Sequence, residues 1–487
     1  MSNKLYKIDW DKYLSSEREN KSSREYDGLG PDKRNPFESD LGRVVFCPAI
    51  RRMHDKTQVV PLTSGDCVLT RLTHSLIVMN IAESLCLNYC RDDDFKELYG
   101  DKWFDYYTSI YAIVRAASLI HDIGNPPFGH FGEIAIQQYF HRYLENFTIS
   151  EDEALDFLSF DGNAQGLRIL SKLQYVGRLD GINLTYSTLG AYMKYPNAGK
   201  ENKKYIGSKK HGVFVTEKDL FDHIVDKCNM RRKNKIIRHP LSYLVEAADS
   251  IGYNVMDVED GFNLGWYSYK IIVGFINQYV TRNAKHIDNE FMSKDKTFDV
   301  ERFLKVRSKI NDVQLSDKYK MMDLRVKLIG YLVELANRRF KDNLNKIDKG
   351  SYSKELIEDE DPYLIVDSLK EFSKRYIISK REVSQVEMSG DSVITGLLDI
   401  LLSYTFNSDK KHRDKLKGVI SDSRLKVTKH EFDGDEGYKY FTEEDLFKFD
   451  LGDLRPYSKM RLIVDFVSSM TDKFAVEMYQ KLSGHVL

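Results

Sequence analysis

The sequence predicts an all-α protein on three observations. The chain has only 10 prolines and 29 glycines in 487 residues, which leaves room for long helices. From residue 70 onward, apolar residues recur mostly at the three- and four-residue spacing of helices. One segment, residues 427–441, instead has two alternating runs around a Gly/Asp turn, which indicate a small β-hairpin among additional C-terminal helices.

The composition excludes several classes of protein. The net charge of −1 argues against nucleic-acid binding driven by overall charge, and the hydrophobic share of 42% excludes global disorder. No apolar stretch resembles a signal peptide or reaches the roughly 18 residues of a membrane span. The five cysteines favour a reducing compartment, so we expect a cytoplasmic protein that does not contact a membrane.

The domain organisation is only softly marked. Residues 1–40 are polar and carry turn signals, which indicates an N-terminal arm. We expect a core in residues 41–280 and a C-terminal helical region in residues 281–487. Their boundary falls near 265–295, and the two regions could form one continuous domain.

The first predicted helix covers residues 70–90. Thr70 or Thr73 could cap its start, and its buried stripe consists of His74, Val78, Ile81 and Leu85. A second helix over residues 105–122 ends before Pro126–Pro127, because proline cannot continue a helix.

The third predicted helix covers residues 240–260. Pro240 stands near its first turn, and its stripe consists of Leu244, Ala248, Ile251, Val255 and Val258. Residues 297–341 and 354–378 also show helical patterns with many exposed charges.

These three helices each present a candidate metal ligand: His74, the pair His121–Asp122, and Asp249. Facing helices of a bundle build metal sites from inward-pointing side chains. Asp249 follows two alanines on an apolar side, and a buried acid is unfavourable without a partner, so a cation is a reasonable one. Taken singly, His74 could be a core histidine and Asp249 could have a lysine partner.

Two further patterns carry chemistry. Glu133 follows His130 by three residues, so the two can form an acid/base pair if a helix begins there. Asp249, Tyr253 and Asp257 repeat every four residues and share one helix face over about 12 Å, the length of a nucleoside. A metal, an aromatic ring and a carboxylate along that face could contact the phosphate, the sugar and the base of a nucleotide in turn.

Eight ordered motifs carry a family resemblance. They are PAIRRMHDKTQVVP (48–61), RLTHS (71–75), HDIGNPPFGHFGE (121–133), FDGNAQGLRIL (160–170), LTYSTLGAYMKYP (184–196), SKKHGVF (208–214), EAADSIGYNVMD (246–257) and REVSQVEMSGDSVITGLL (381–398). Over about residues 40–400, the chain closely resembles the HD-domain deoxynucleoside triphosphate triphosphohydrolases, and within them the bacterial dGTPase branch.

The resemblance implies an HD-domain helical bundle and a reaction. Water attacks the α-phosphorus of a dNTP such as dGTP, and deoxynucleoside and tripolyphosphate leave. It implies one divalent ion on His74, His121, Asp122 and Asp249, and this mixed N/O set suits Mn, Fe, Co, Zn or Ni, and Mg less naturally. His130, with Glu133, would protonate the leaving 5′-oxygen or activate water. Asn125 stands where relatives outside this branch often carry histidine.

The resemblance also implies a set of substrate-binding residues. Tyr253 would contact the deoxyribose, and Asp257 and Gln58 the 3′-hydroxyl. Arg71, one turn before His74, can reach a phosphate, and the remaining candidates around the polyphosphate are Asn163, Lys194, Tyr195 and Lys210. Lys209 and Lys210 are adjacent and point to different sides, which leaves their assignment open.

Partners and rival functions complete the expectations. Relatives form homohexamers, so a homo-oligomer is expected, with single-stranded DNA or a dNTP as an effector. The locally basic segment 200–240 could bind polyphosphate or a nucleic-acid strand, but a solvated surface is preferred. Rival functions are another HD-scaffold nucleotidase or phosphodiesterase, and a nucleotide or DNA sensor without turnover.

Overall fold

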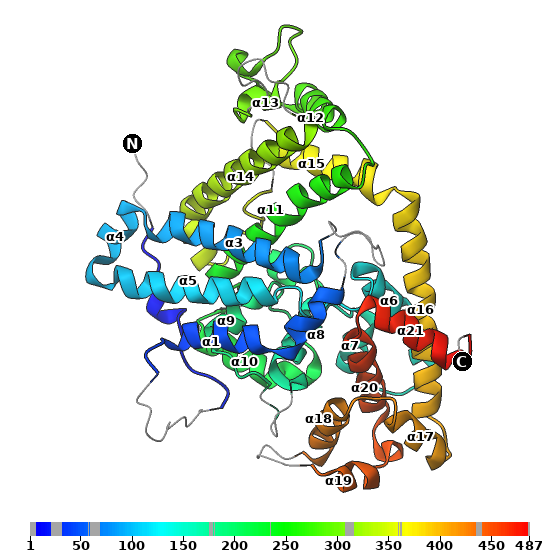
Figure 1. Ribbon diagram of the computed structural model, residues 1–487. Coiled ribbons are helices and arrows are strands. Elements are labelled where there is room, and N and C mark those ends of the chain that lie inside the picture. The colour runs from blue at the N-terminus through cyan, green and yellow to red at the C-terminus, as the bar shows by residue number, and fades with distance from the viewer. Residues whose placement is uncertain are drawn as a thin grey trace.

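The computed structural model is built almost entirely of helices (Figure 1). It describes residues 6–20, 32–56, 58, 69–174, 179, 181–233, 235–306, 316–358, 360, 363–434 and 441–485. Among these, no helix combines the length and hydropathy needed to cross a membrane. The all-α prediction is therefore confirmed.

The first half of the chain folds into eleven of the described α-helices. They are α1 (Pro36–Phe46), α2 (Pro48–Arg52), α3 (Arg71–Cys90), α4 (Asp93–Tyr99), α5 (Trp103–Ile120), α6 (His130–Tyr143), α7 (Glu151–Leu158), α8 (Gly162–Arg168), α9 (Tyr186–Tyr192), α10 (Lys218–Lys227) and α11 (Pro240–Asn263). A short antiparallel pair, β1 (Arg231–Arg232) and β2 (Lys235–Ile236), lies between α10 and α11.

The second half adds ten described α-helices. They are α12 (Tyr269–Asn283), α13 (Val300–Phe303), α14 (Asp317–Asp348), α15 (Ile365–Ser373), α16 (Arg381–Thr405), α17 (Lys410–Lys417), α18 (Asp422–Asp433), α19 (Glu443–Lys448), α20 (Pro456–Ser468) and α21 (Asp472–Leu482). A π-helical turn, Lys374–Ile378, continues α15.

A central bundle holds the three helices that carry the candidate ligands. α3 packs between α5 and α11, and α11 also packs against α14 (Figure 1). Thr70 caps α3 in a capping box with Thr73, and Pro240 occupies the first turn of α11. The predicted stripes of both helices are buried, so these helices and their core faces are confirmed.

The hydrophobic interior divides into two clusters. The first fills the central bundle and includes Trp10, which is fully buried beside Tyr89 of α3, so the N-terminal segment 6–20 packs into the bundle. The second is built by α6 and α7 together with α16, α18, α20 and α21. Figure 1 shows α16 running along one side of the molecule, with α20 and α21 beside it.

The predicted β-hairpin at 427–441 is wrong. Its first half belongs to α18, where Leu425 and Thr428, three residues apart, are both buried, as helical spacing requires. Gly434 has a φ of +66° and ends the helix in the left-handed conformation instead of turning a hairpin. Residues 435–440 lie outside the described part of the chain, and Phe441 lies in no strand.

The two long helical patterns of the C-terminal region are partly corrected. Within 297–341, helix α13 is only one turn long, residues 307–315 are not described, and α14 begins at Asp317. Within 354–378, the helix begins only at Ile365. Exposed charged residues are compatible with many backbone conformations. The hydrophobic pattern of these stretches therefore did not fix where each helix begins and ends.

An ion network at the junction of the two clusters is deeply buried. The guanidinium of Arg168 on α8 donates to Glu217 at 2.9 Å, to Glu431 on α18 at 2.9 Å and to Asp465 on α20 at 2.7 Å. The Arg168 side chain is 1% exposed. Removing Arg168 would take their common partner from these acids and leave their charge only partly compensated, by Lys172 and Arg461.

We predict that Arg168→Ala lowers the free energy of unfolding by about 3–5 kcal/mol, because three carboxylates lose their common partner. Urea unfolding followed by circular dichroism measures this change. Arg455→Ala is the control, because Arg455 pairs with Glu153 at 3.1 Å while its side chain is 71% exposed, and it should change stability by less than about 1 kcal/mol. Equal effects of the two substitutions would contradict a structural role for the network.

Candidate active site

The structure brings together three of the four predicted metal ligands. His74 comes from α3, His121 follows the last turn of α5, and Asp249 lies in the middle of α11. One ligand atom from each lies within 4.8 Å of the other two. The Oδ1 atom of Asp249 is 3.2 Å from Nε2 of His74 and 3.4 Å from Nε2 of His121.

The donor set fits a divalent cation. Nδ1 of His121 bonds to the Ser118 carbonyl oxygen at 2.7 Å, which directs the Nε2 lone pair at the cluster. That Nε2 atom is buried without a hydrogen-bond partner. Burial opposes a charge on the ring, but Asp122 and Asp249 outweigh it and raise the pKa of His121 to about 9. The cluster therefore favours a positive charge at its centre, which a cation would provide.

The fourth predicted ligand, Asp122, lies beside the cluster but has other partners. Its Oδ1 is 3.6 Å from Nε2 of His121 and accepts a hydrogen bond from Asn125 at 2.7 Å. Its Oδ2 accepts one from Arg71 at 2.6 Å. Arg71, predicted to reach a phosphate, is thus paired with a carboxylate in this structure.

A small cavity opens beside the cluster. Its volume is about 90 Å³, well below the roughly 300–1,000 Å³ of typical ligand pockets, so it has room for a group of phosphate size only. Its walls include His121, Asp122, Asn163, Lys194, Glu246 and Asp249. Nζ of Lys194 is 3.8 Å from Asp249, so Asp249 has the lysine neighbour that the alternative interpretation required, in addition to the two histidines.

The predicted acid/base pair is formed at the start of α6. Nδ1 of His130 and Oε2 of Glu133 are 2.8 Å apart, and the other oxygen of Glu133 accepts the backbone N–H of Gly162 at 2.7 Å. The His130 side chain is 67% exposed, whereas that of Glu133 is 7% exposed. The hydrogen bond to Glu133 raises the pKa of His130 above its ordinary value, although partial burial opposes this.

The residues predicted to surround the polyphosphate form a cationic group around one aromatic ring. The Tyr195 ring centroid is 5.9 Å from Lys194, 6.0 Å from Lys210 and 5.7 Å from Arg238. Lys210 donates to Asp161 at 2.6 Å, whereas Lys209 is exposed to solvent. Lys210, rather than Lys209, therefore faces this group.

The residues predicted to contact the sugar include two unsatisfied polar atoms. Oδ1 of Asp257 and Oε1 of Gln58 are buried and have no hydrogen-bond partner among the described residues. Burial, with Asp260 nearby, raises the pKa of Asp257 well above its ordinary value. Burial raises the pKa of Tyr253, on the same helix, to about 12. A ligand hydroxyl would satisfy such buried atoms.

Three residues of the site were missed from the sequence. Glu246 forms a buried ion pair with Arg238, and Asp161 holds Lys210. Glu246 lies one helical turn before Asp249, so helical spacing could have found it. Nothing in the local pattern distinguishes Arg238.

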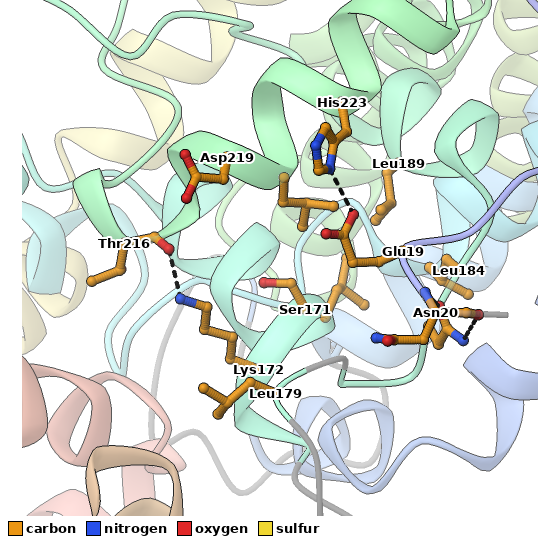
Figure 2. Close-up of a pocket in the computed structure, with 13 residues that line it drawn as sticks. Glu19, Asn20, Ser171, Lys172, Leu179, Leu184, Leu189, Thr216, Asp219 and His223 are labelled. Atoms are coloured by element: carbon orange, nitrogen blue, oxygen red, sulfur yellow. Dashed lines mark hydrogen bonds and ion pairs between the residues drawn. The ribbon is translucent and has the colours of Figure 1, made fainter. Parts of the chain in front are cut away.

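The largest described pocket lies elsewhere. It has a volume of about 560 Å³ and is drawn in Figure 2, where Nδ1 of His223 approaches Glu19 at 3.1 Å and Lys172 donates to the carbonyl oxygen of Thr216. None of the predicted site residues lines it. The donor chemistry, rather than cavity size, identifies the candidate active site.

Three basic residues of the segment 200–240 pair with acids on the surface. Lys200 contacts Glu151 at 3.1 Å, and Lys227 contacts Glu17 at 2.7 Å. Arg231 contacts two aspartates of α10. These pairs support the preferred interpretation as a solvated surface.

Comparisons with known proteins cover nearly the whole chain. A protein from Listeria innocua named deoxyguanosinetriphosphate triphosphohydrolase-like protein is 32% identical over 98% of this chain and 99% of its own length. Proteins named deoxyguanosinetriphosphate triphosphohydrolase match from Cronobacter sakazakii, at 30% identity over 98% of each chain, and from Salmonella typhimurium, at 31% over 92% of this chain and 93% of the relative.

Residues 447–481 also match the family model described as the phosphohydrolase-associated domain, a segment that includes α20 and most of α21. The identity and the coverage of the full-length relatives agree with the resemblance seen in the motifs. The chain therefore belongs to the deoxyguanosinetriphosphate triphosphohydrolase family.

Proposed function

We propose that this protein hydrolyses deoxynucleoside triphosphates, dGTP among them, to deoxynucleoside and inorganic tripolyphosphate. The observation that carries the proposal is the meeting of His74, His121 and Asp249 from three helices. The names of the full-length relatives support the substrate class. The base preference, the products and the attack of water on the α-phosphorus are part of the proposal.

His74, His121, Asp122 and Asp249 would hold one divalent ion, of which Mn, Fe, Co, Zn and Ni suit the N/O donors and Mg suits them less. A bound divalent ion polarises a phosphoryl oxygen and lowers the pKa of water. Asp122 can join this set through Oδ1, which lies on the His121 side, while Oδ2 stays with Arg71.

His130 would donate the proton that the 5′-oxygen needs as it leaves. The hydrogen bond that Glu133 accepts from the ring raises the pKa of His130, which keeps more of the ring protonated near neutral pH and favours the acid role over the base role. Glu133 is fixed in turn by the Gly162 N–H, so the ring is oriented by a positioned carboxylate.

The remaining predicted residues would bind the substrate. Lys194 and Lys210, which both lie over the Tyr195 ring, would present cationic charge to the polyphosphate, with Arg71 and Asn163 beside the ligand cluster. Tyr253 would pack against the deoxyribose, and Gln58 and Asp257 would bond to the 3′-hydroxyl, which supplies partners to their unsatisfied atoms. That the protein forms a homo-oligomer, and that a dNTP or a DNA strand acts as its effector, are still predictions.

Product analysis tests the proposed reaction. Purified protein with Mn²⁺ and each of the four dNTPs should release tripolyphosphate and deoxynucleoside. In water enriched with heavy oxygen, the label should enter tripolyphosphate and not the deoxynucleoside, because the bond between the α-phosphorus and the 5′-oxygen breaks. Release of pyrophosphate or single phosphate would reject the proposal in favour of another nucleotidase.

We predict that Asp249→Ala abolishes metal binding and lowers kcat by more than about 100-fold, because Asp249 contacts both histidines. Metal analysis after dialysis and steady-state kinetics measure the two losses. Asp93→Ala is the control, because Asp93 is an exposed acid on α4 and should change neither value. Full metal content in Asp249→Ala would remove the assignment.

We predict that Glu133→Gln moves the alkaline fall of kcat to lower pH. The carboxylate raises the pKa of His130, so the protonated ring required of an acid is lost only as pH rises through that raised pKa. Glutamine removes the charge, the pKa falls toward its ordinary value, and activity is lost earlier. The glutamine oxygen still accepts the Gly162 N–H.

The measurement is kcat against pH for wild type, Glu133→Gln and Glu145→Gln. Glu145 is an exposed acid just beyond α6 and serves as the matched control. An alkaline limb that coincides in all three proteins would show that His130 does not act as the acid.

A further inference from the structure

The loop between Asp122 and His130 joins the two halves of the proposed site. It starts at the ligand pair that ends α5 and finishes at the acid that begins α6. Two consecutive residues in it are left-handed, Phe128 with a φ of +62° and Gly129 with a φ of +58°. For a bulky residue such as Phe128 this conformation is unfavourable and persists only where the surroundings fix it.

One of these fixing contacts comes from the far end of the chain. The backbone N–H of Phe128 donates to Oδ1 of Asp472 at 2.9 Å, across 344 residues of sequence. Asp472 is the first residue of α21 and is 3% exposed. This buried, charge-assisted hydrogen bond therefore restrains Phe128, the residue with the unfavourable backbone conformation.

A second contact comes from Lys56, which is 3% exposed. Its Nζ donates to the carbonyl oxygen of Asn125 at 2.5 Å and to that of Ser468, at the end of α20, at 3.1 Å. One buried amine therefore bridges the loop and the C-terminal helices. Burial makes its charge unfavourable, and the nearby Asp472 carboxylate opposes that effect.

A third contact is steric. The Phe128 ring is 2% exposed and packs against α16 at Gly390, where a Cβ atom would come within 2.8 Å of the ring. No side chain fits at that position without moving the ring. The loop is thus held by a hydrogen bond at Phe128, an amine at Asn125 and a close backbone approach at Gly390.

We propose that Asp472 and Lys56 are positioning residues for catalysis, and that the segment matching the phosphohydrolase-associated domain serves to hold the Asp122–His130 loop in its working geometry. The proposal rests on the proposed function for its effect on turnover. Asp472 holds the Phe128 N–H and Lys56 holds the Asn125 carbonyl oxygen, so both residues would act through the loop backbone. Small displacements of reacting groups are costly, about 100-fold for 1 Å.

The test compares Asp472→Ala with Asp472→Asn. Asparagine keeps an oxygen that accepts the Phe128 N–H, whereas alanine removes it. We expect Asp472→Ala to lower kcat about 10- to 100-fold with KM changed less than about 3-fold. Asp472→Asn should recover most of kcat, although both variants lose the same negative charge at the start of α21.

The matched control is Asp450→Ala. Asp450 lies in the same segment and forms a two-bond ion pair with Arg413 at 2.7 and 2.8 Å, away from the loop. Its removal should lower the melting temperature and leave kcat unchanged in the folded protein. If kcat of Asp450→Ala fell as much as kcat of Asp472→Ala, general instability would explain both losses, and the proposal would be overturned.

Hydrogen–deuterium exchange gives a readout that needs no activity. In Asp472→Ala, peptides spanning residues 123–131 should exchange faster, while in Asp450→Ala they should match wild type. Lys56→Met keeps the aliphatic stem and removes the donors, so it should reproduce the faster exchange and the lower kcat, and it replaces Asp472→Ala if that variant does not fold.

The two proposals fail differently. Wild-type protein that is inactive on every dNTP would reject the proposed function, and the exchange data would still decide whether the loop is held by Asp472 and Lys56. Active wild type with unchanged kcat and unchanged loop exchange in Asp472→Ala and Lys56→Met would overturn the positioning role alone.

Discussion

The close approach of α3 and α11 around Asp249 is the constraint on which the site depends. At Gly252, one turn after Asp249, a side chain would meet Val78 at 3.3 Å and the His74 ring at 3.4 Å. The small residue allows His74 and Asp249 to come within 3.2 Å. A carboxylate at such a buried crossing is unfavourable unless positive charge faces it. The helix geometry therefore creates a demand for positive charge beside Asp249, and this demand defines the cluster.

The same demand explains why the cations of the site are already paired. Arg71 is bound to Asp122, Lys210 to Asp161, and Lys194 lies between two acids of α11. In the proposed function, a bound triphosphate would compete with these carboxylates for the cations. Asp122 holds Arg71 through Oδ2 and keeps Oδ1 on the His121 side.

Much of the site could be predicted from the spacing of residues within single helices. Contacts between residues far apart in the sequence could not be predicted. The turn spacing of His130 and Glu133 predicted a hydrogen bond that the structure contains at 2.8 Å. The stripes of α3 and α11 predicted which faces are buried, and His74, a member of the α3 stripe, is fully buried. The bond between Phe128 and Asp472 has no sequence pattern, because the partners are 344 residues apart and each is ordinary in its own segment.

The wrong hairpin has the same physical origin. Residues 427–433 contain only two large apolar residues, Val427 and Phe432, so the segment itself does not distinguish a strand from a short helix, and the helix that forms packs against α20. Gly434 suits a hairpin turn and a left-handed helix end equally well. The secondary structure of short amphipathic segments at the surface of the second core is thus the hardest to predict from their own residues.

The second core acts on the site through α8 as well as through the loop. Asp465 on α20 accepts hydrogen bonds from Gln165 at 3.0 Å and from Arg168 at 2.7 Å, both on α8. The first residue of α8, Gly162, donates its N–H to Glu133 and leaves no room for a side chain beside that carboxylate. The C-terminal helices therefore fix both the backbone that carries His130 and the partner that orients its ring. We therefore expect that removal of the C-terminal region would disturb the geometry of the His130–Glu133 pair.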